Sequence, residues 1–261
     1  MNRLIATTFL LATLLVGCAK PTDPAAPVGE EAGGLLLAVD LGAVAPDPAM
    51  ERLLAPYRVE VEKLREPIGE SHGGMIHQAR KVTPLGCWVT DIMRERAAQV
   101  AGRPVDFAFT NSGGIRAALP DGPVSYDIIS QILPFDNTLA MIDLDGTAFR
   151  RLLEKICSDR DGHSISGAFI EGDAENNLVS ATIGGKALDD SRQYLVVTNN
   201  YLSSGGGGMA MLKEFAQQDT GVFQRDAVAD HVRELTAAGK KIEQPADYPR
   251  YRYAEKKEGA P

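Results

Sequence analysis

The sequence predicts a single domain of the α+β class, built of mixed α/β layers and extending from about residue 48 to about residue 250. Two observations lead to this prediction. Segments with apolar side chains at helix-type spacings follow segments in which apolar and polar residues alternate as in strands. The 261 residues are 44% hydrophobic and 24% charged, which is ordinary globular composition with enough length for a sizeable core.

The expected elements follow from these periodicities. Residues 50–64 place apolar side chains three and four positions apart, which predicts a helix, with a kink at Pro56. Residues 84–99 begin with a proline, which suits the first turn of a helix, and carry one apolar face. The other expected elements are a strand at 105–109, a short helix at 126–133, a strand at 139–144, a helix at 146–157 capped by Thr147, a strand and turn at 177–188, a central strand at 193–198 and an amphipathic helix at 226–235.

The first 47 residues are expected to lie outside this domain. Arg3 and the apolar stretch 4–16, which is too short to span a bilayer comfortably, are typical of a signal peptide. The stretch ends in Leu-Val-Gly-Cys, which resembles a bacterial lipobox, so we expect residues 1–18 to be the signal and Cys18 to carry lipid; a plain secretory signal with an incidental cysteine is the alternative. Residues 19–47 are expected to form a flexible tether and residues 251–261 a tail.

These features predict a location and exclude one class of partner. The protein is expected outside the cytoplasm, attached to a bacterial membrane through its lipid alone. In a two-membrane bacterium, Ala19 rather than Asp after the lipidated cysteine favours the outer membrane, facing the periplasm. The formal net charge of -8 argues against nucleic acid as the main partner. An oxidising compartment permits a Cys87–Cys157 bridge, but both residues lie in apolar helix-like stretches and the sequence leaves the question open.

Four consecutive glycines, Gly205 to Gly208, follow the predicted central strand in the stretch NNYLSSGGGGM. A phosphate-binding P-loop needs Lys and Ser or Thr after its last glycine, whereas Met209 follows here, so that interpretation fails. The dinucleotide fingerprint is matched formally by Gly205, Gly207 and Ala210, but several residues separate it from the preceding strand. Because such a run is costly to order, it needs another explanation.

A second loop, Asn111-Ser-Gly-Gly-Ile-Arg116, comes just after a predicted strand and combines three kinds of binding group. The amide of Asn111 offers both a donor and an acceptor, which suits the edge of a heterocycle. Arg116 offers a fork for phosphate or carboxylate. Gly113 and Gly114 let the backbone approach a ligand closely.

Two aromatic residues stand on separate predicted loops. Phe135 follows Pro134 in a turn, and Tyr201 follows the central strand. Together they could clamp a flat base, and such stacking contributes about 1–3 kcal/mol per base while tolerating different bases. The alternative is that both rings cap the core.

The order and spacing of these motifs carry a family resemblance. The landmarks are 111–116 (NSGGIR), 133–135 (LPF), 166–167 (SG), 184–188 (GGKAL), 194–197 (YLVV) and 200–206 (NYLSSGG). They resemble the C-terminal domain of the 5'-nucleotidase family, which includes UDP-sugar hydrolases and 2',3'-cyclic phosphodiesterases. Residues 83–91 (TPLGCWVTD) look like the family's T-N-L-G-N-L-x-x-D helix start, and residues 50–69 look like the helix that joins its two domains.

The resemblance implies a substrate-binding site and a fold like that of the family's C-terminal domain. In the family two aromatics sandwich the nucleobase, and Phe135 and Tyr201 occupy their places. Asn111 and Arg116 occupy places in the loop that binds base, sugar and phosphate. The glycine run, with Gly205 and Gly206, corresponds to the loop beside the base. The chain departs from the family at three positions: Gly207 replaces the Asp that holds ribose hydroxyls, and Pro84 and Cys87 replace two Asn of the helix start.

The family's hydrolysis takes place on a separate N-terminal metallophosphoesterase domain, where two metals are held by Asp, His and Asn. The four histidines of this chain form no such cluster, and His72 and His77 are poorly spaced to share a metal. We therefore expect no catalytic residue, metal site or cofactor in this chain, and two divalent metals on a partner metallophosphoesterase.

The resulting functional hypothesis is the nucleotide- or nucleoside-binding half of a 5'-nucleotidase-type phosphohydrolase, acting in extracytoplasmic nucleotide catabolism. It would be inactive alone and would work with a separate catalytic chain, for which the helix at 50–64 would be the docking surface. Two alternatives remain open, a nucleotide-binding lipoprotein without an enzyme partner and a degenerate scaffold that has lost its ligand.

Overall fold

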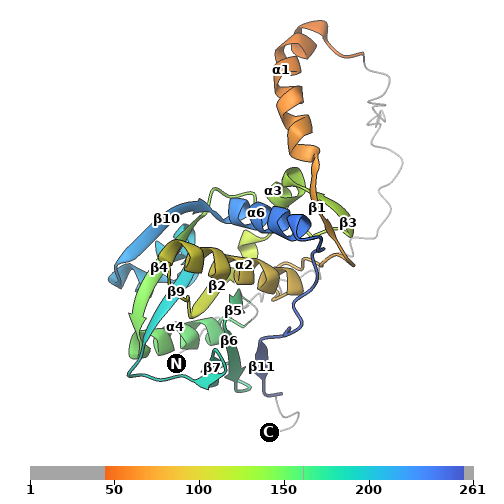
Figure 1. Cartoon of the computed structure of the whole chain (residues 1–261). Coiled ribbons are helices and arrows are strands. Elements are labelled where there is room, and N and C mark those ends of the chain that lie inside the picture. The colour runs from red at the N-terminus through yellow and green to blue at the C-terminus, as the bar shows by residue number, and fades with distance from the viewer. Residues whose placement is uncertain (1–44, 161, 256–261) are drawn as a thin grey trace, which may run out of the picture. The chain divides into compact units, whose positions relative to one another are not determined.

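The computed structural model describes residues 45–160 and 162–255, and the chain divides into two units, Met1–Pro48 and Ala49–Pro261. The predicted signal, the Cys18 lipidation site and most of the predicted tether lie outside the described residues. Apart from Pro48, the helices and strands labelled in Figure 1 belong to the second unit.

Helices and strands are mixed along the chain, as the sequence predicts, but five strands follow one another between residues 163 and 199. The helices are α1 (Pro48–Arg65), α2 (Pro84–Ala101), α3 (Tyr126–Ile132), α4 (Gly146–Ser158), α5 (Asn200–Ser203) and α6 (Gln224–Ala237). The strands are β1 (Pro67–Ser71), β2 (Phe107–Asn111), β3 (Gly122–Ser125), β4 (Thr138–Asp145), β5 (His163–Ser166), β6 (Ala168–Gly172), β7 (Leu178–Ile183), β8 (Lys186–Ala187), β9 (Gln193–Asn199), β10 (Gln217–Phe223) and β11 (Tyr251–Tyr253). Residues 251–253, which the sequence analysis assigned to a tail, thus form a strand.

The main sheet has five strands in the order β10-β4-β9-β2-β5, so β9 occupies its centre and the expected central strand is confirmed. β9 pairs antiparallel with β4 and parallel with β2. A second sheet has the order β11-β6-β7-β8, and β1 pairs with β3. Because β2 and β9 are parallel neighbours, their carboxyl ends meet at one edge of the main sheet, the place where open sheets of this kind bind ligands.

Both faces of the main sheet are covered by helices. Successive residues of a strand point to opposite faces, so each strand contributes to two cores. In β9, Leu195 and Val197 join a core with α2 and α6, whereas Tyr194 and Val196 join a second core with α4. The same alternation runs through β2 and β4. Figure 1 shows α2 and α6 on one side of the sheet and α4 on the other. The two cores hold the strand ends in fixed relative positions.

Helix caps confirm one expectation and correct another. The side chain of Thr83 accepts a hydrogen bond from Gly86 N at 3.3 Å, and Pro84 stands in the first turn of α2 as expected. In α4 the cap is Asp145, not Thr147. Asp145 Oδ1 accepts from Ala148 N at 2.8 Å, and the Thr147 hydroxyl donates to the same oxygen. The prediction was wrong because the helix begins at Gly146, which places the threonine inside the first turn.

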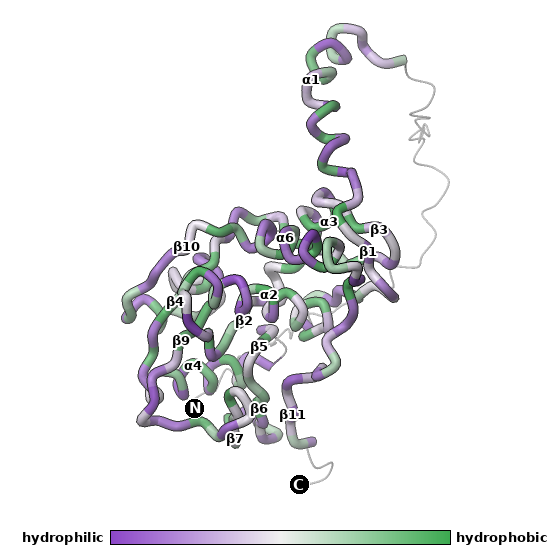
Figure 2. Tube along the Cα trace, in the orientation of Figure 1, coloured by the Kyte–Doolittle hydropathy of each residue, from purple (hydrophilic) through white to green (hydrophobic). Residues whose placement is uncertain are grey.

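Helix α1 differs from the other long helices because none of its residues is buried. It runs through Pro56 as one helix, and hydrophilic and hydrophobic residues alternate along it (Figure 2). Several large apolar side chains are exposed, among them Leu53 at 63%, Tyr57 at 66% and Leu64 at 44%. Within residues 45–160 and 162–255, no helix combines the length and apolar character needed to cross a bilayer.

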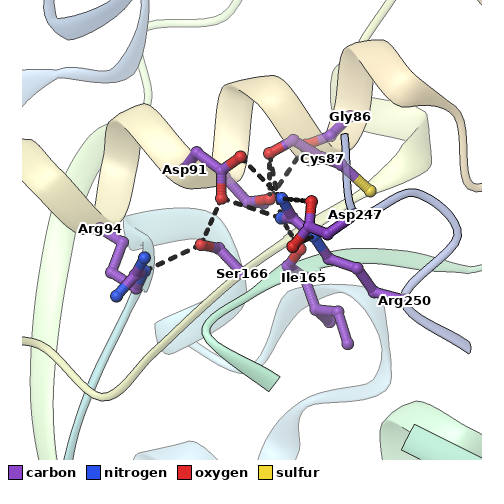
Figure 3. A network of polar contacts seen from close by, with 9 residues as sticks. Gly86, Cys87, Asp91, Arg94, Ile165, Ser166, Asp247 and Arg250 are labelled. Carbon is purple, nitrogen blue, oxygen red and sulfur yellow. Dashed lines mark hydrogen bonds and ion pairs between the residues drawn. The ribbon is translucent and has the colours of Figure 1, made fainter. Parts of the chain in front are cut away.

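A buried guanidinium attaches the last described segment to α2 and β5. Arg250 is 4% exposed, and its terminal nitrogens donate to both carboxylate oxygens of Asp91 at 2.9 and 2.7 Å. It also donates to the carboxylate of Asp247 and to the backbone oxygen of Ile165 at 2.6 Å. Ser166 donates to Asp91 at 2.5 Å, so the carboxylate is shared between two elements (Figure 3). We call these contacts the Arg250 clasp.

Burial opposes the charged form of Arg250, but its bonds to Asp91 and Asp247 outweigh that effect and raise its pKa. The hydrogen bonds from Arg250 lower the pKa of Asp247. Cys87 lies beside the clasp, and burial raises the pKa of its thiol to about 12. Cys87 and Cys157 are both free thiols in the structure, so the bridge that the sequence left open does not form between them.

Candidate functional site

A cavity of about 420 Å³ lies where β2 and β9 end. Its lining residues come from the end of β2 and the turn after it, from the segment between α3 and β4, and from α5 directly after β9; they are Asn111, Gly113, Gly114, Phe135, Asn137 and Tyr201. Five of these six were expected from the sequence. They converge because the two parallel strands end side by side, and because α3 leads into β4, which pairs with β9.

The Asn111 loop is a tight turn over Ser112–Gly114. A Cβ on Gly114 would lie 3.2 Å from Asn111 Oδ1, so the glycine leaves room for the amide to lie against the turn. Buried Asn199, at the end of β9, donates to the hydroxyl of Thr110 at 3.2 Å and to Asn111 Oδ1 at 3.5 Å. Within the described residues no hydrogen bond occupies the amide nitrogen of Asn111, so it remains able to donate to a ligand.

The two aromatic rings line the same cavity and are about half exposed. Phe135 is 46% exposed and Tyr201 is 49% exposed. Rings that capped the core would be largely buried, as Phe107 and Phe109 are. A large apolar surface left open on both sides of a cavity is suited to contact with a flat ligand.

Arg116 lies over one of these rings and is not part of the cavity lining. Its guanidinium carbon lies 5.8 Å from the centre of the Phe135 ring, and its side chain donates to the backbone oxygen of Gly113 at 3.3 Å. Its backbone N–H donates to Ile132 O at 2.9 Å, which joins the Asn111 loop to the end of α3. Gly205 and Gly206 also lie outside the lining, although Gly206 packs directly against Tyr201.

Asn137 is the lining residue that the sequence analysis missed. It follows Phe135 in the same turn, and its backbone oxygen accepts from Gln224 N at 2.8 Å, which fixes the turn against the start of α6. The available signal was its position: a polar residue two places after a loop aromatic, just before a strand. The cavity thus offers two amides between two rings, and amides can both donate to and accept from a heterocycle.

No acidic or basic side chain belongs to the cavity lining. Throughout the part of the chain that the structure describes, no group of three or more His, Cys, Asp or Glu side chains could hold a metal ion. His163, opposite Asn111 in the β2–β5 pair, is 2% exposed, and burial lowers its pKa to about 4. It is therefore neutral near pH 7 and belongs to the packing beneath the site.

The structure is a mixed α/β domain whose cavity presents aromatic rings and amides at the carboxyl ends of parallel strands. Residues 67–214, more than half of the chain, match the family model described as "5'-nucleotidase, C-terminal domain". The chain therefore belongs to the 5'-nucleotidase C-terminal domain family, as its motifs led us to expect.

Curated relatives and solved structures agree with this membership. The chain is 26% identical over 217 residues to the trifunctional nucleotide phosphoesterase protein YfkN of Bacillus subtilis, covering 72% of this chain and 14% of that protein. It is 26% identical over 182 residues to protein UshA of Escherichia coli, covering 65% and 31%. A 5'-nucleotidase precursor from Thermus thermophilus superposes with a TM-score of 0.66 at 27% identity, covering 80% of this chain and 43% of the other. The chain thus spans less than a third of the length of these two curated relatives and less than half of the solved structure.

Proposed function

We propose that this protein binds the nucleoside part of nucleotides and serves as the substrate-binding half of a 5'-nucleotidase-type phosphohydrolase. One observation carries the proposal: Phe135 and Tyr201, each half exposed, line one cavity together with two amides. Membership of the family supports the ligand class.

In this proposal the base lies between the rings, and Asn111 and Asn137 contact its polar edge. Stacking on two rings contributes about 1–3 kcal/mol for each ring and discriminates weakly between bases. The amides supply the directional contacts, because an unpaired amide in a site that excludes water is costly. The guanidinium of Arg116, at the edge of the same site, is available to a phosphate group.

Calorimetric titration of the wild-type protein with adenosine, AMP, a UDP-sugar and ribose 5-phosphate tests this function. The proposal predicts micromolar binding of the ligands that carry a base and much weaker binding of ribose 5-phosphate. Equal affinity for AMP and ribose 5-phosphate would show that the site recognises phosphate alone. No heat from any ligand up to millimolar concentration would favour the alternative of a scaffold without a ligand.

We also propose that phosphate-ester cleavage is performed by a separate metallophosphoesterase chain that carries two divalent metals and docks on α1. The exposed apolar side chains of α1, such as Leu53, Tyr57 and Leu64, support a docking role, since large apolar surface left open on one helix favours association. Deleting the protein from its source cells should then lower AMP hydrolysis outside the cytoplasm. Wild-type protein should restore it, and a Leu53→Glu/Leu64→Glu variant that still binds adenosine should not.

The location of the protein in the cell is a separate proposal. We propose that the protein is anchored through a lipid on Cys18 outside the cytoplasm, facing the periplasm where an outer membrane exists. Labelling with radioactive palmitate and fractionation of the cells test it. A Cys18→Ala variant recovered in the membrane fraction as fully as the wild type would contradict the anchor.

A further inference from the structure

The glycine run does not line the cavity, although it begins four residues after Tyr201. We propose that Gly206 and Gly207 are positioning residues that hold the Tyr201 ring as a fixed wall of the cavity. This inference rests on the proposed function for its biological use, but the positioning itself is a property of the free protein. It also explains why three of the four consecutive glycines, Gly205 to Gly207, are needed.

Position 206 requires glycine because the side chain and backbone of Tyr201 approach it closely. A Cβ at this position would lie 2.5 Å from Cζ of Tyr201 and 2.6 Å from its backbone oxygen, closer than real Cβ contacts. The φ of Gly206 is not in the left-handed region, so a larger residue is excluded by the ring and the backbone oxygen of Tyr201 and not by the backbone angle. The run therefore folds directly onto the edge of the ring.

Gly207 supplies a hydrogen bond to the same ring. Its backbone N–H donates to Tyr201 Oη at 3.1 Å. The run reaches this position through backbone in the left-handed region, with φ of 89° at Gly205 and 59° at Gly207, which glycine adopts without strain. A phenylalanine at position 201 could not accept this bond. The hydroxyl is thus used by the protein itself, and the ring face remains available to the cavity.

The opposite wall is held differently. The side chain of Phe135 has no polar atom, and the exposed guanidinium of Arg116 lies over its ring, 5.8 Å from the ring centre. One ring of the cavity is therefore held by a hydrogen bond and a close backbone contact, and the other by a cation–π contact. Fixing a ring before a ligand arrives removes part of the ordering cost of binding, an advantage on the order of two- to tenfold in affinity for one side chain.

Amide hydrogen exchange on the ¹⁵N-labelled full chain, without ligand, tests the positioning directly. The Gly207 amide should exchange at least about fivefold more slowly in the wild type than in Tyr201→Phe, because the substitution removes only the acceptor. Gly221 is an internal control: its N–H donates to Asp219 Oδ1 at 2.9 Å, and its exchange should be the same in both proteins. Equal exchange of Gly207 in the two proteins would overturn the proposal.

Adenosine titrations of variants then test the consequence for binding. Gly206→Ala should weaken binding about two- to tenfold in the wild-type background and clearly less in a Tyr201→Leu background, where the contact with the ring is gone and only the contact with the backbone oxygen of residue 201 remains. Gly221→Ala controls for glycine replacement in an exposed segment: unlike Gly206 this position has positive φ, but it has open space around it, so its replacement strains the backbone without touching Tyr201 and should leave adenosine binding unchanged. An equal loss from Gly206→Ala in both backgrounds would contradict positioning. A Gly207 amide protected by the hydroxyl in a protein that binds no nucleoside would leave the positioning intact and refute the proposed function.

Discussion

Two regions of this domain differ in whether their polar side chains are paired within the protein. In the Arg250 clasp, a buried guanidinium has its hydrogen bonds taken up by Asp91, Asp247 and backbone oxygens. In the cavity between Phe135 and Tyr201, amide groups and ring faces are left open. The polar groups of the clasp are paired within the fold, whereas the amides of the cavity line an open space, as the proposed binding of a ligand requires. The comparison predicts that substitutions in the clasp change stability and that substitutions in the cavity change binding.

The largest effect is expected from Arg250→Ala. It leaves the carboxylate of Asp91 without its main partner, and breaking a buried ion pair costs about 3–5 kcal/mol. Urea denaturation should show this loss in the free energy of unfolding. Arg252→Ala is the matched control, because Arg252 pairs with Glu171 but is 73% exposed, and its removal should cost less than about 1 kcal/mol. Equal losses from the two substitutions would contradict the distinction.

Acid should weaken the packing beneath the cavity. The pKa of His163 is lowered by burial from 6.5 to about 4, so the unfolded chain binds its proton more tightly than the folded protein does. The stability that depends on neutral His163 is therefore complete above pH 6.5 and falls as the pH drops toward 4. The linked loss is about 3 kcal/mol. His163→Gln should remove this part of the pH dependence, and an unchanged pH profile in the variant would refute the assignment.

A smaller effect, confined to binding, is expected from the amides. Asn111→Ala and Asn137→Ala should each weaken adenosine binding by about 1–2 kcal/mol, because each removes a hydrogen bond to the base. Asn137→Ala should leave the unfolding free energy nearly unchanged, since the contact that fixes its turn comes from its backbone oxygen. If a variant loses stability but keeps its affinity for adenosine, the amide it lacks stabilises the fold and does not contact the ligand.

An effect of the same size, but confined to ligands that carry a phosphate group, is expected from Arg116→Gln. If the guanidinium contacts phosphate, the substitution should weaken AMP binding by about 1–2 kcal/mol and leave adenosine binding nearly unchanged. Parallel titrations of the two ligands measure the difference. The same loss for both would mean that Arg116 acts only by supporting the Phe135 ring.

The residues of the cavity could be predicted from the sequence better than those of the clasp, because the clasp joins residues that are far apart along the chain. β9 was recognised because five consecutive apolar or β-branched residues mark a strand buried on both faces. Asn111 and Tyr201 follow adjacent strands, so a local pattern locates them. Arg250 and Asp91, by contrast, are 159 residues apart, and no local pattern links them.

Several strands were missed for a related reason. β10 has the sequence QQDTGVF, with polar residues and a glycine, and it forms because its backbone pairs with β4 at the edge of the sheet. β5, with the sequence HSIS, is buried throughout despite its polar residues. Hydrophobic periodicity cannot detect either strand, because tertiary pairing overrides intrinsic preference. β2 begins two residues later than expected, where Asp106 accepts a hydrogen bond from Leu195 N instead of continuing the strand.

The central claim is that the two half-exposed rings form one site for a nucleobase. It is tested most directly by calorimetric titration of adenosine into the wild type, Phe135→Ala, Tyr201→Ala and the double variant, with thermal unfolding as the control for folding. We predict a loss of about 1–3 kcal/mol for each single variant and no measurable binding by the double variant, with unfolding temperatures close to that of the wild type. Undiminished adenosine binding by the folded double variant would show that the base lies elsewhere and would contradict the account.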